Sequence, residues 1–201
     1  MSLGVGDACF GYGGVPVFAG LSFEVGPGEA VAVVGANGSG KSTLLRCLVG
    51  AEVLDAGTVL FDGAPADESS AAFRAGVASL LDDADHFPDL SVVEHLRLLA
   101  WLHGSEADVA PVLAEVGLAD VADQLPPTLS SGQRHRLGLA SCFVRPRSVL
   151  VLDEPEQRLD AAGRAWLRAR LLAEKAAGVA VVFASHDAAL VEAVACRTVA
   201  L

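Results

Sequence analysis

The stretch Gly35–Thr43, GANGSGKST, constrains the fold of this chain more than any other part of the sequence. It fits the pattern G-x-x-x-x-G-K-[ST] and stands between the apolar run AVAVVG and a helical pattern. In that setting the loop turns backbone N–H groups toward phosphate oxygens, the lysine reaches the β and γ phosphates, and the serine binds Mg2+. The sequence therefore predicts that Lys41 and Ser42 take these roles and that Thr43 assists at the α phosphate. The residues expected to bind the nucleotide are Gly35, Asn37, Gly38, Ser39, Gly40, Lys41, Ser42 and Thr43.

Two further apolar runs are similar to the one before this loop: VLVLD at residues 149–153 and VAVVFAS at residues 179–185. Continuous apolar runs of this length are typical of parallel strands that are buried on both faces. With helical patterns between them, they predict an α/β fold, a P-loop NTPase core with a mainly parallel sheet. LSFEV, at residues 21–25, alternates apolar and polar positions and predicts a half-exposed strand of an N-terminal antiparallel β-subdomain.

The segment from about residue 84 to 145 has mostly helical patterns and predicts a helical subdomain inserted in the core. Its run SVVEHLRLLAWL opens with Ser91 and Glu94 in the spacing of a capping box. This run has more apolar residues than one buried helix face requires, so it either lines a groove for a partner or is wholly buried. The length of 201 residues fits one domain, residues 1–201.

Charge and composition exclude some classes of protein. A net charge of -11 and a pI of about 4.7 oppose nucleic-acid binding. The mean hydropathy of +0.47 is high, yet no stretch approaches the roughly 18 apolar residues of a membrane span. The start, MSLGVGDACF, does not have the pattern of a signal peptide. We expect reduced thiols in a cytosolic protein, because no Cys-x-x-Cys pair occurs among Cys9, Cys47, Cys142 and Cys196.

Ionisable side chains follow the other two predicted strands. Asp153 and Glu154 end the first, where one carboxylate can hold Mg2+ through water and the other can orient or deprotonate an attacking water. His186 follows the second, where an imidazole could contact a γ phosphate. Acids also favour helix starts, and a single histidine at a strand end is often structural. Because the chain also has the phosphate-binding loop, we interpret Asp153, Glu154 and His186 as catalytic or metal-binding residues.

These motifs, in this order, resemble the ATPase domains of ATP-binding cassette (ABC) transporters. The similar stretches extend along nearly the whole chain: GANGSGKST, LSSGQ at residues 129–133, LVLDEP at residues 150–155, Leu159–Asp160 and SHD at residues 185–187. A P-loop kinase would not explain LSSGQ. The resemblance implies that Glu154 is the general base and His186 the switch histidine. It also implies that Tyr12 stacks on adenine, with Phe10 as a rival for that role.

LSSGQ is a second glycine-bearing turn that opens a helix, a geometry that suits an anion. The resemblance implies that this turn binds the ATP of another subunit. Two subunits, identical or different, would meet head to tail, with each ATP between the phosphate loop of one and Ser130, Gly132 and Gln133 of the other. Asp160 would lie in the loop that crosses this interface. Taken alone, the turn could simply be a capped helix start.

Three stretches depart from the family pattern. Ser131 replaces the first of two usual glycines, and EQR at residues 156–158 is bulkier and more charged than the usual approach to Asp160. Leu81-Asp82-Asp83 stands where the family has a glutamine that senses the metal and the γ phosphate. Because a carboxylate is a hard-oxygen ligand, we expect Asp82 to bind Mg2+, with Asp83 as a competitor for this role.

The resemblance implies an Mg-dependent ATPase that energises transport by a separate membrane-spanning subunit. Such a subunit is cytoplasmic and peripheral, on the inner face of the cell membrane. The chain stops soon after the SHD helix, which favours the compact export type over importers with an extra regulatory domain. The rival is a soluble ABC ATPase acting on ribosomes or DNA, but those usually have two cassettes or long coiled coils.

Overall fold

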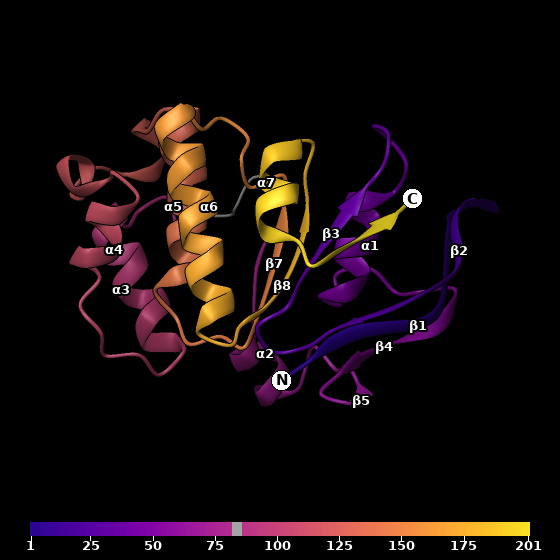
Figure 1. The fold of residues 1–201 in the computed structure, drawn as a ribbon. Helices are drawn as coiled ribbons and strands as arrows, with labels where there is room; N and C mark the ends of the chain where they lie inside the picture. Colours follow the sequence, from indigo (N-terminus) through magenta and orange to yellow (C-terminus); the bar gives the residue numbers. More distant parts are fainter. Residues whose placement is uncertain (82–85) are drawn as a thin grey trace.

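The computed structural model describes residues 1–81 and 86–201, which form two sheets flanked by helices (Figure 1). The larger sheet has the order β6-β7-β8-β3-β9 and is parallel at every pairing. Its strands are β3 (Ala30–Val34), β6 (Val77–Leu80), β7 (Val149–Asp153), β8 (Ala180–Ala184) and β9 (Arg197–Ala200). The smaller, antiparallel sheet has the order β2-β1-β4-β5. Its strands are β1 (Leu3–Tyr12), β2 (Val15–Val25), β4 (Ala56–Phe61) and β5 (Ala64–Pro65).

Side chains of the parallel sheet alternate between two buried faces. Val31 and Val33 of β3 belong to an apolar cluster that includes the smaller sheet and α1 (Lys41–Leu48). Ala30 and Ala32 belong to a second cluster on the other face. Because both faces are buried, apolar residues occupy every position of the strand. The continuous apolar runs predicted β3, β7 and β8 for this reason, and all three predictions are confirmed.

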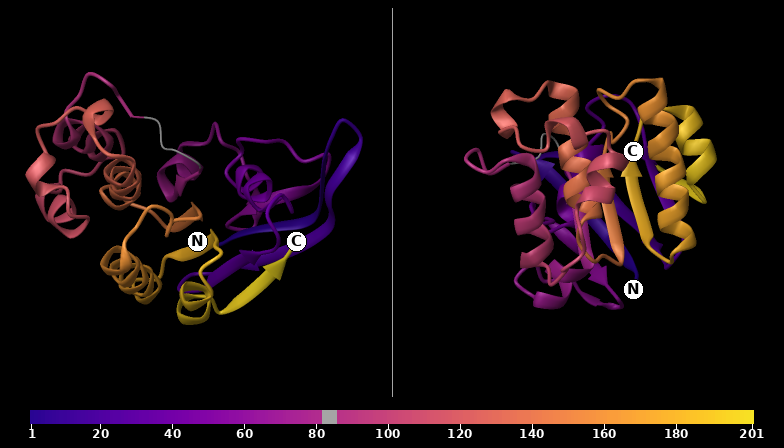
Figure 2. Two further views of the ribbon diagram at one scale, coloured as in Figure 1. Left: turned by 90° about the horizontal axis from the view of Figure 1, so that it is seen from above. Right: turned by 90° about the vertical axis from the view of Figure 1, so that its left-hand side faces the viewer.

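Helices complete the layers on both faces of the sheet. Helix α1 packs against β1, β7 and β8, between the two sheets. The opposite face is covered by α6 (Ala161–Ala176) and α7 (Ala188–Val194), as the view from above shows (Figure 2). The short helix α2 (Ala71–Gly76) leads into β6. This layering brings the carboxyl ends of β3, β7 and β8 to one edge, next to the start of α1.

A separate helical lobe lies at the left of Figure 1. It contains α3 (Val92–Leu102), α4 (Ala110–Glu115), two 3-10 turns (Ala119–Val121 and Pro126–Thr128) and α5 (Ser131–Phe143), around an apolar cluster of its own. The predicted fold class, with its β-subdomain and inserted helical subdomain, is therefore confirmed. The capping box of α3 is confirmed too, since Ser91 N donates to Glu94 Oε2 at 2.8 Å and Ser91 Oγ accepts from Glu94 N.

Helix α3 is not wholly buried, because Trp101 is 70% exposed and Leu102 is 56% exposed. Complete burial, one of the two interpretations of this run, is therefore wrong. Two hydrogen bonds join α4 of the helical lobe to α6 of the core: Glu115 accepts from Trp166 Nε1 at 3.1 Å and from Arg170 Nη1 at 2.7 Å. Within residues 1–81 and 86–201, no helix is long and apolar enough to cross a membrane.

Candidate functional site

The phosphate-binding loop has a backbone that requires glycine at Gly40. This residue has φ +101° and stands directly before α1, and a Cβ atom there would lie 2.3 Å from Val17 Cγ1. A left-handed conformation combined with so close a neighbour excludes other residues. Lys41 Nζ donates to the carbonyl oxygens of Gly35 and Ala36, both at 3.0 Å, and lies over the loop. Ser39 Oγ is buried and has no hydrogen-bond partner among the described residues, so it can take one from a ligand.

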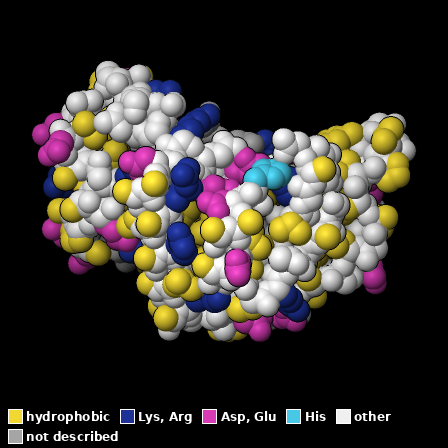
Figure 3. Space-filling model, turned by 45° about the horizontal axis from the view of Figure 1, so that its top comes forward, with side chains coloured by type: hydrophobic (Ala, Val, Ile, Leu, Met, Phe, Trp, Pro, Cys, Tyr) yellow, Lys and Arg dark blue, Asp and Glu magenta, His cyan; other side chains and the backbone are white. Residues whose placement is uncertain are grey.

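A cavity of about 430 Å3 lies at this loop. Its size is within the range of small-molecule sites. It brings together residues from four separate parts of the chain: Tyr12, Val17, Asn37, Gly38, Gly40, Lys41, Ser42, Thr43, Glu154 and His186. Most of the residues that the sequence marks for nucleotide binding and catalysis therefore line one cavity. Figure 3 shows acidic side chains next to a histidine in the hollowed region of one face.

Glu154 and His186 meet in this cavity because they follow neighbouring strands. Asp153 of β7 pairs with Ala184 of β8, so the residues after both strands emerge together. Glu154 N donates to the carbonyl of Ala184 at 2.9 Å, and His186 Nε2 lies 3.3 Å from Glu154 Oε1. Glu154 Oε2 accepts from the Gln157 side chain. Asp153 ends β7, is buried, and is not among the described residues that line the cavity.

The structure separates the two aromatic candidates. Tyr12 is 54% exposed and lines the cavity, whereas Phe10 is 6% exposed and belongs to the core. The Phe10 ring stacks on Phe18, with centroids 6.0 Å apart, and meets the Tyr12 ring edge-on at 4.9 Å. Phe10 thus supports Tyr12 from the core side. Of the two rings, Tyr12 is the one that can reach a bound base.

The LSSGQ turn lies outside this cavity. Ser130 is the N-cap of α5: Ser130 Oγ accepts from Gln133 N at 3.2 Å, and Ser130 N donates to Gln133 Oε1 at 2.8 Å. Neither these two residues nor Gly132 line the cavity. Ser131 is the first residue of α5, where φ is negative, so serine replaces glycine there without strain.

Asp160 joins two helices. Its Oδ1 caps α6 by accepting from Gly163 N at 2.8 Å and also accepts from Arg136 Nη2 of α5 at 3.0 Å. One residue before Arg136, His135 Nε2 lies 2.9 Å from the carbonyl oxygen of Pro155. The LSSGQ helix is therefore attached to the segment that follows Glu154. Asp82 and Asp83, the expected metal ligand and its competitor, lie outside the described residues.

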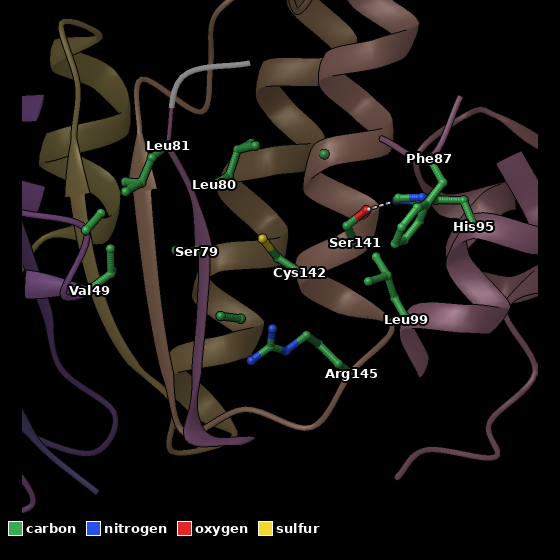
Figure 4. Close-up of a pocket in the computed structure, with 13 residues that line it drawn as sticks. Val49, Ser79, Leu80, Leu81, Phe87, His95, Leu99, Ser141, Cys142 and Arg145 are labelled. Carbon is green, nitrogen blue, oxygen red and sulfur yellow. Dashed lines mark hydrogen bonds between the residues drawn. The ribbon is translucent and has the colours of Figure 1, made fainter. Parts of the chain in front are cut away.

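A second cavity, of about 490 Å3, separates the helical lobe from the core (Figure 4). Leu80 of β6, Leu99 of α3 and Cys142 of α5 are among its apolar walls. His95 lines it too, with Nε2 3.3 Å from Ser141 Oγ. Burial, assisted by the charge of His86, lowers the pKa of His95 to about 4. His95 was not among the residues predicted from the sequence, although a histidine on the apolar face of α3 was a signal for it.

Comparisons with known proteins agree with this geometry. The family profile described as ABC transporter matches residues 18–157. The cytochrome c biogenesis ATP-binding export protein CcmA of Roseobacter denitrificans is 40% identical over 186 residues, which cover 92% of this chain and 84% of the relative. The protein of the same name from Xanthomonas campestris pv. campestris (strain 8004) is 39% identical over 179 residues, covering 86% and 81%.

Solved structures have the same fold. An ATP-binding subunit of an ABC transporter matches with a TM-score of 0.91 and 28% identity, over 100% of this chain and 86% of that one. A bacterial ABC transporter cassette solved as a dimer matches with a TM-score of 0.88 and 19% identity, over 99% and 94%. The second likeness shows the fold alone.

Fold and site together define a P-loop ATPase. The chain belongs to the ABC transporter family. It binds ATP and hydrolyses it to energise transport, as the resemblance implied. The fold class, the family and the ATPase activity predicted from the sequence are confirmed, while the roles of individual residues stay predictions.

Proposed function

We propose that the 430 Å3 cavity is where ATP binds and is hydrolysed. The observation that carries this proposal is the convergence of Tyr12, the phosphate-binding loop, Glu154 and His186 on one cavity. In this proposal Tyr12 stacks on adenine and Lys41 binds the β and γ phosphates. The left-handed backbone at Gly40, with φ +101°, fits a loop that turns its N–H groups toward a phosphate.

Glu154 acts on the attacking water in this proposal. A Glu154 carboxylate oxygen takes a proton from the water whose oxygen attacks the γ phosphorus, and the bond to the bridging oxygen of ADP breaks. His186 orients the γ phosphate and Glu154. The hydroxyl of Ser42 and the carboxylates of Asp153 and Asp82 are hard-oxygen donors that fit Mg2+. When bound, Mg2+ would neutralise charge on the β and γ phosphates.

We infer that a complete site needs a second subunit. Ser130, Gly132 and Gln133 lie outside the cavity, and Ser130 and Ser131, at the N-terminal end of α5, are exposed. The helix dipole makes this end partly positive, so it attracts an anion such as a phosphate. In a head-to-tail homodimer or heterodimer, these residues would contact the γ phosphate of the other subunit, with Asp160 in the interface. Within each subunit, residues 1–201 would form one domain in which the helical segment from about 84 to 145 is inserted.

We propose that this ATPase serves an exporter in cytochrome c biogenesis, on the cytoplasmic face of the cell membrane. The support is the shared name of relatives that are 38–40% identical over most of this chain. A helix of a membrane-spanning partner would dock at the 490 Å3 cavity beside α3. The net charge of -11 disfavours the rival, an ABC ATPase acting on ribosomes or DNA.

The test replaces the chromosomal gene in the source organism with a Lys41→Ala or an Arg168→Ala version. Both remove one positive charge, but Arg168 is exposed on α6 and remote from the phosphate loop. We expect Lys41→Ala to abolish the c-type cytochromes seen in absorbance spectra, and Arg168→Ala to preserve them. Normal cytochromes in the Lys41→Ala strain would contradict the export proposal. Sedimentation of the protein with ribosomes, reversed by salt, would instead favour the rival.

A further inference from the structure

Glu156 connects the turn after β7 with the turn after β8. Its Oε1 accepts three hydrogen bonds from consecutive residues: from Ser185 Oγ at 2.5 Å, His186 N at 3.1 Å and Asp187 N at 3.3 Å. Its Oε2 is buried and makes no hydrogen bond within the described part of the chain. Hydrogen bonds to a carboxylate are stronger than those between neutral groups. Three of them on one oxygen therefore fix the turn that carries His186.

The backbone around Glu156 is itself held in an uncommon conformation. Glu154 has φ +44° and Arg158 has φ +58°, and neither is glycine. Such residues persist only where the surroundings hold them. The contacts of Glu156 with the β8 turn, together with the bond from the Gln157 side chain to Glu154 Oε2, supply that support.

The fixed turn places His186 against Glu154, with Nε2 3.3 Å from Oε1. Glu156 itself does not line the 430 Å3 cavity. We propose that Glu156 is a positioning residue for ATP hydrolysis, which holds the His186 imidazole at the distance from Glu154 that the reaction needs. This rests on the roles proposed above for Glu154 and His186. It also assigns a role to Glu156, the first residue of the EQR stretch at residues 156–158 that departs from the family pattern.

The experiment compares ATP hydrolysis by the purified full chain and five variants. Glu156→Ala removes the carboxylate, and Glu156→Gln keeps one acceptor oxygen and the shape. Glu106→Ala is the matched control, because Glu106 is exposed between α3 and α4 and its removal changes the charge equally. His186→Ala, alone and with Glu156→Ala, completes a double-mutant cycle. Thermal unfolding checks that each variant is folded.

We expect Glu156→Ala to lower kcat about 10- to 100-fold, with KM for ATP within about twofold, since small displacements of reacting groups have effects of this size. Glu156→Gln should restore most of the loss, and Glu106→Ala should match the wild type. If Glu156 acts through His186, the double variant should be no slower than His186→Ala. A merely structural role of Glu156 would instead reduce kcat further in the absence of His186.

The outcomes separate this proposal from the function on which it rests. If His186→Ala loses activity while Glu156→Ala keeps wild-type kcat, or if the two losses multiply in the double variant, the positioning role is overturned and the proposed site stands. A wild-type kcat for His186→Ala overturns both the positioning role of Glu156 and the proposed role of His186 in hydrolysis.

A second measurement does not depend on turnover. The chain has five histidines, so the NMR signals of the His186 ring can be assigned by comparison with His186→Ala. These signals should shift in Glu156→Ala and stay in place in Glu106→Ala. Unchanged ring signals in a folded Glu156→Ala protein would overturn the positioning role.

Discussion

His186 Nε2 lies 3.3 Å from Glu154 Oε1, although the two residues belong to motifs far apart in the sequence. The distance follows from strand pairing: β7 and β8 are parallel neighbours, and Asp153 stands opposite Ala184. Glu154 is the first residue after β7 and His186 is the second residue after β8, at the edge where the start of α1 also lies. The proposed catalytic pair is therefore a consequence of the sheet, and its members can be tested separately.

Replacing Glu154 with glutamine is expected to separate binding from hydrolysis. Glutamine keeps the shape of the side chain but cannot accept the proton of the attacking water. We expect kcat to fall at least about 100-fold, the usual contribution of a general base, with ATP affinity close to that of the wild type. Phosphate release and binding of a fluorescent ATP analogue measure the two effects, with Glu106→Gln as the control. Hydrolysis at the wild-type rate would show that Glu154 is not the base.

Tyr12 and Phe10 should respond differently to truncation. Stacking of a base on an aromatic ring contributes about 1–3 kcal/mol, so Tyr12→Ala should raise the dissociation constant of ATP about tenfold, and Tyr12→Phe should not. Phe10 is buried, so Phe10→Ala should lower the free energy of unfolding by about 3 kcal/mol or more. Calorimetric titration and urea unfolding measure these quantities. The assignment is wrong if Phe10→Ala weakens ATP binding without loss of stability.

Dimerisation should depend on ATP and on Ser130. The Glu154→Gln protein should be monomeric without nucleotide and dimeric with ATP and Mg2+ in light scattering. Ser130→Asp keeps an acceptor at the N-cap of α5 but places a negative charge where the γ phosphate of the other subunit is expected. We therefore expect it to abolish the dimer, while Ser70→Asp, the same change at the N-cap of α2, should not. A dimer that forms without nucleotide and survives Ser130→Asp would contradict the composite site.

His95 should make the protein less stable in acid. Burial, with the charge of His86, lowers its pKa from 6.5 to about 4 in the folded state. Above pH 6.5 both states are neutral at His95, whereas between pH 6.5 and pH 4 only the unfolded state takes up the proton. The free energy of unfolding should therefore fall as the pH is lowered, by about 2 kcal/mol between pH 7 and pH 5 from this group.

Urea unfolding at both pH values, in the wild type and in His95→Gln, isolates this effect from that of the carboxyl groups. The loss of stability should be smaller in His95→Gln. Equal losses in the two proteins would mean that the buried histidine does not cause the acid sensitivity.

Asp82 stands in the sequence where the family has glutamine, and its effect should appear in the metal dependence of hydrolysis. A carboxylate adds negative charge near the γ phosphate, which the metal must offset. We expect ATPase activity to depend more steeply on the Mg2+ concentration in the wild type than in Asp82→Gln, with faster hydrolysis in the variant. Equal midpoints and equal rates would exclude a role of Asp82 in metal sensing.

Only the tertiary structure distinguishes Tyr12 from Phe10, because burial depends on what packs against β1. The edge strands β6 and β9 and the shifted register of β1 were not predicted either. Such elements are short or irregular, and their partners come from distant parts of the chain. His95 became a candidate for acid sensitivity only when its burial and the neighbouring His86 were visible.

The sequence by itself determined the local elements: the loop at Gly35–Thr43, the buried strands β3, β7 and β8, and the capping box at Ser91. Each depends on residues that are close in sequence, so its pattern can be read directly from the chain. The tertiary structure alone decided how Glu156 reaches the turn of His186, 30 residues away. The physical reason is that this contact exists only after β7 and β8 pair, and no local pattern records which strands will be neighbours.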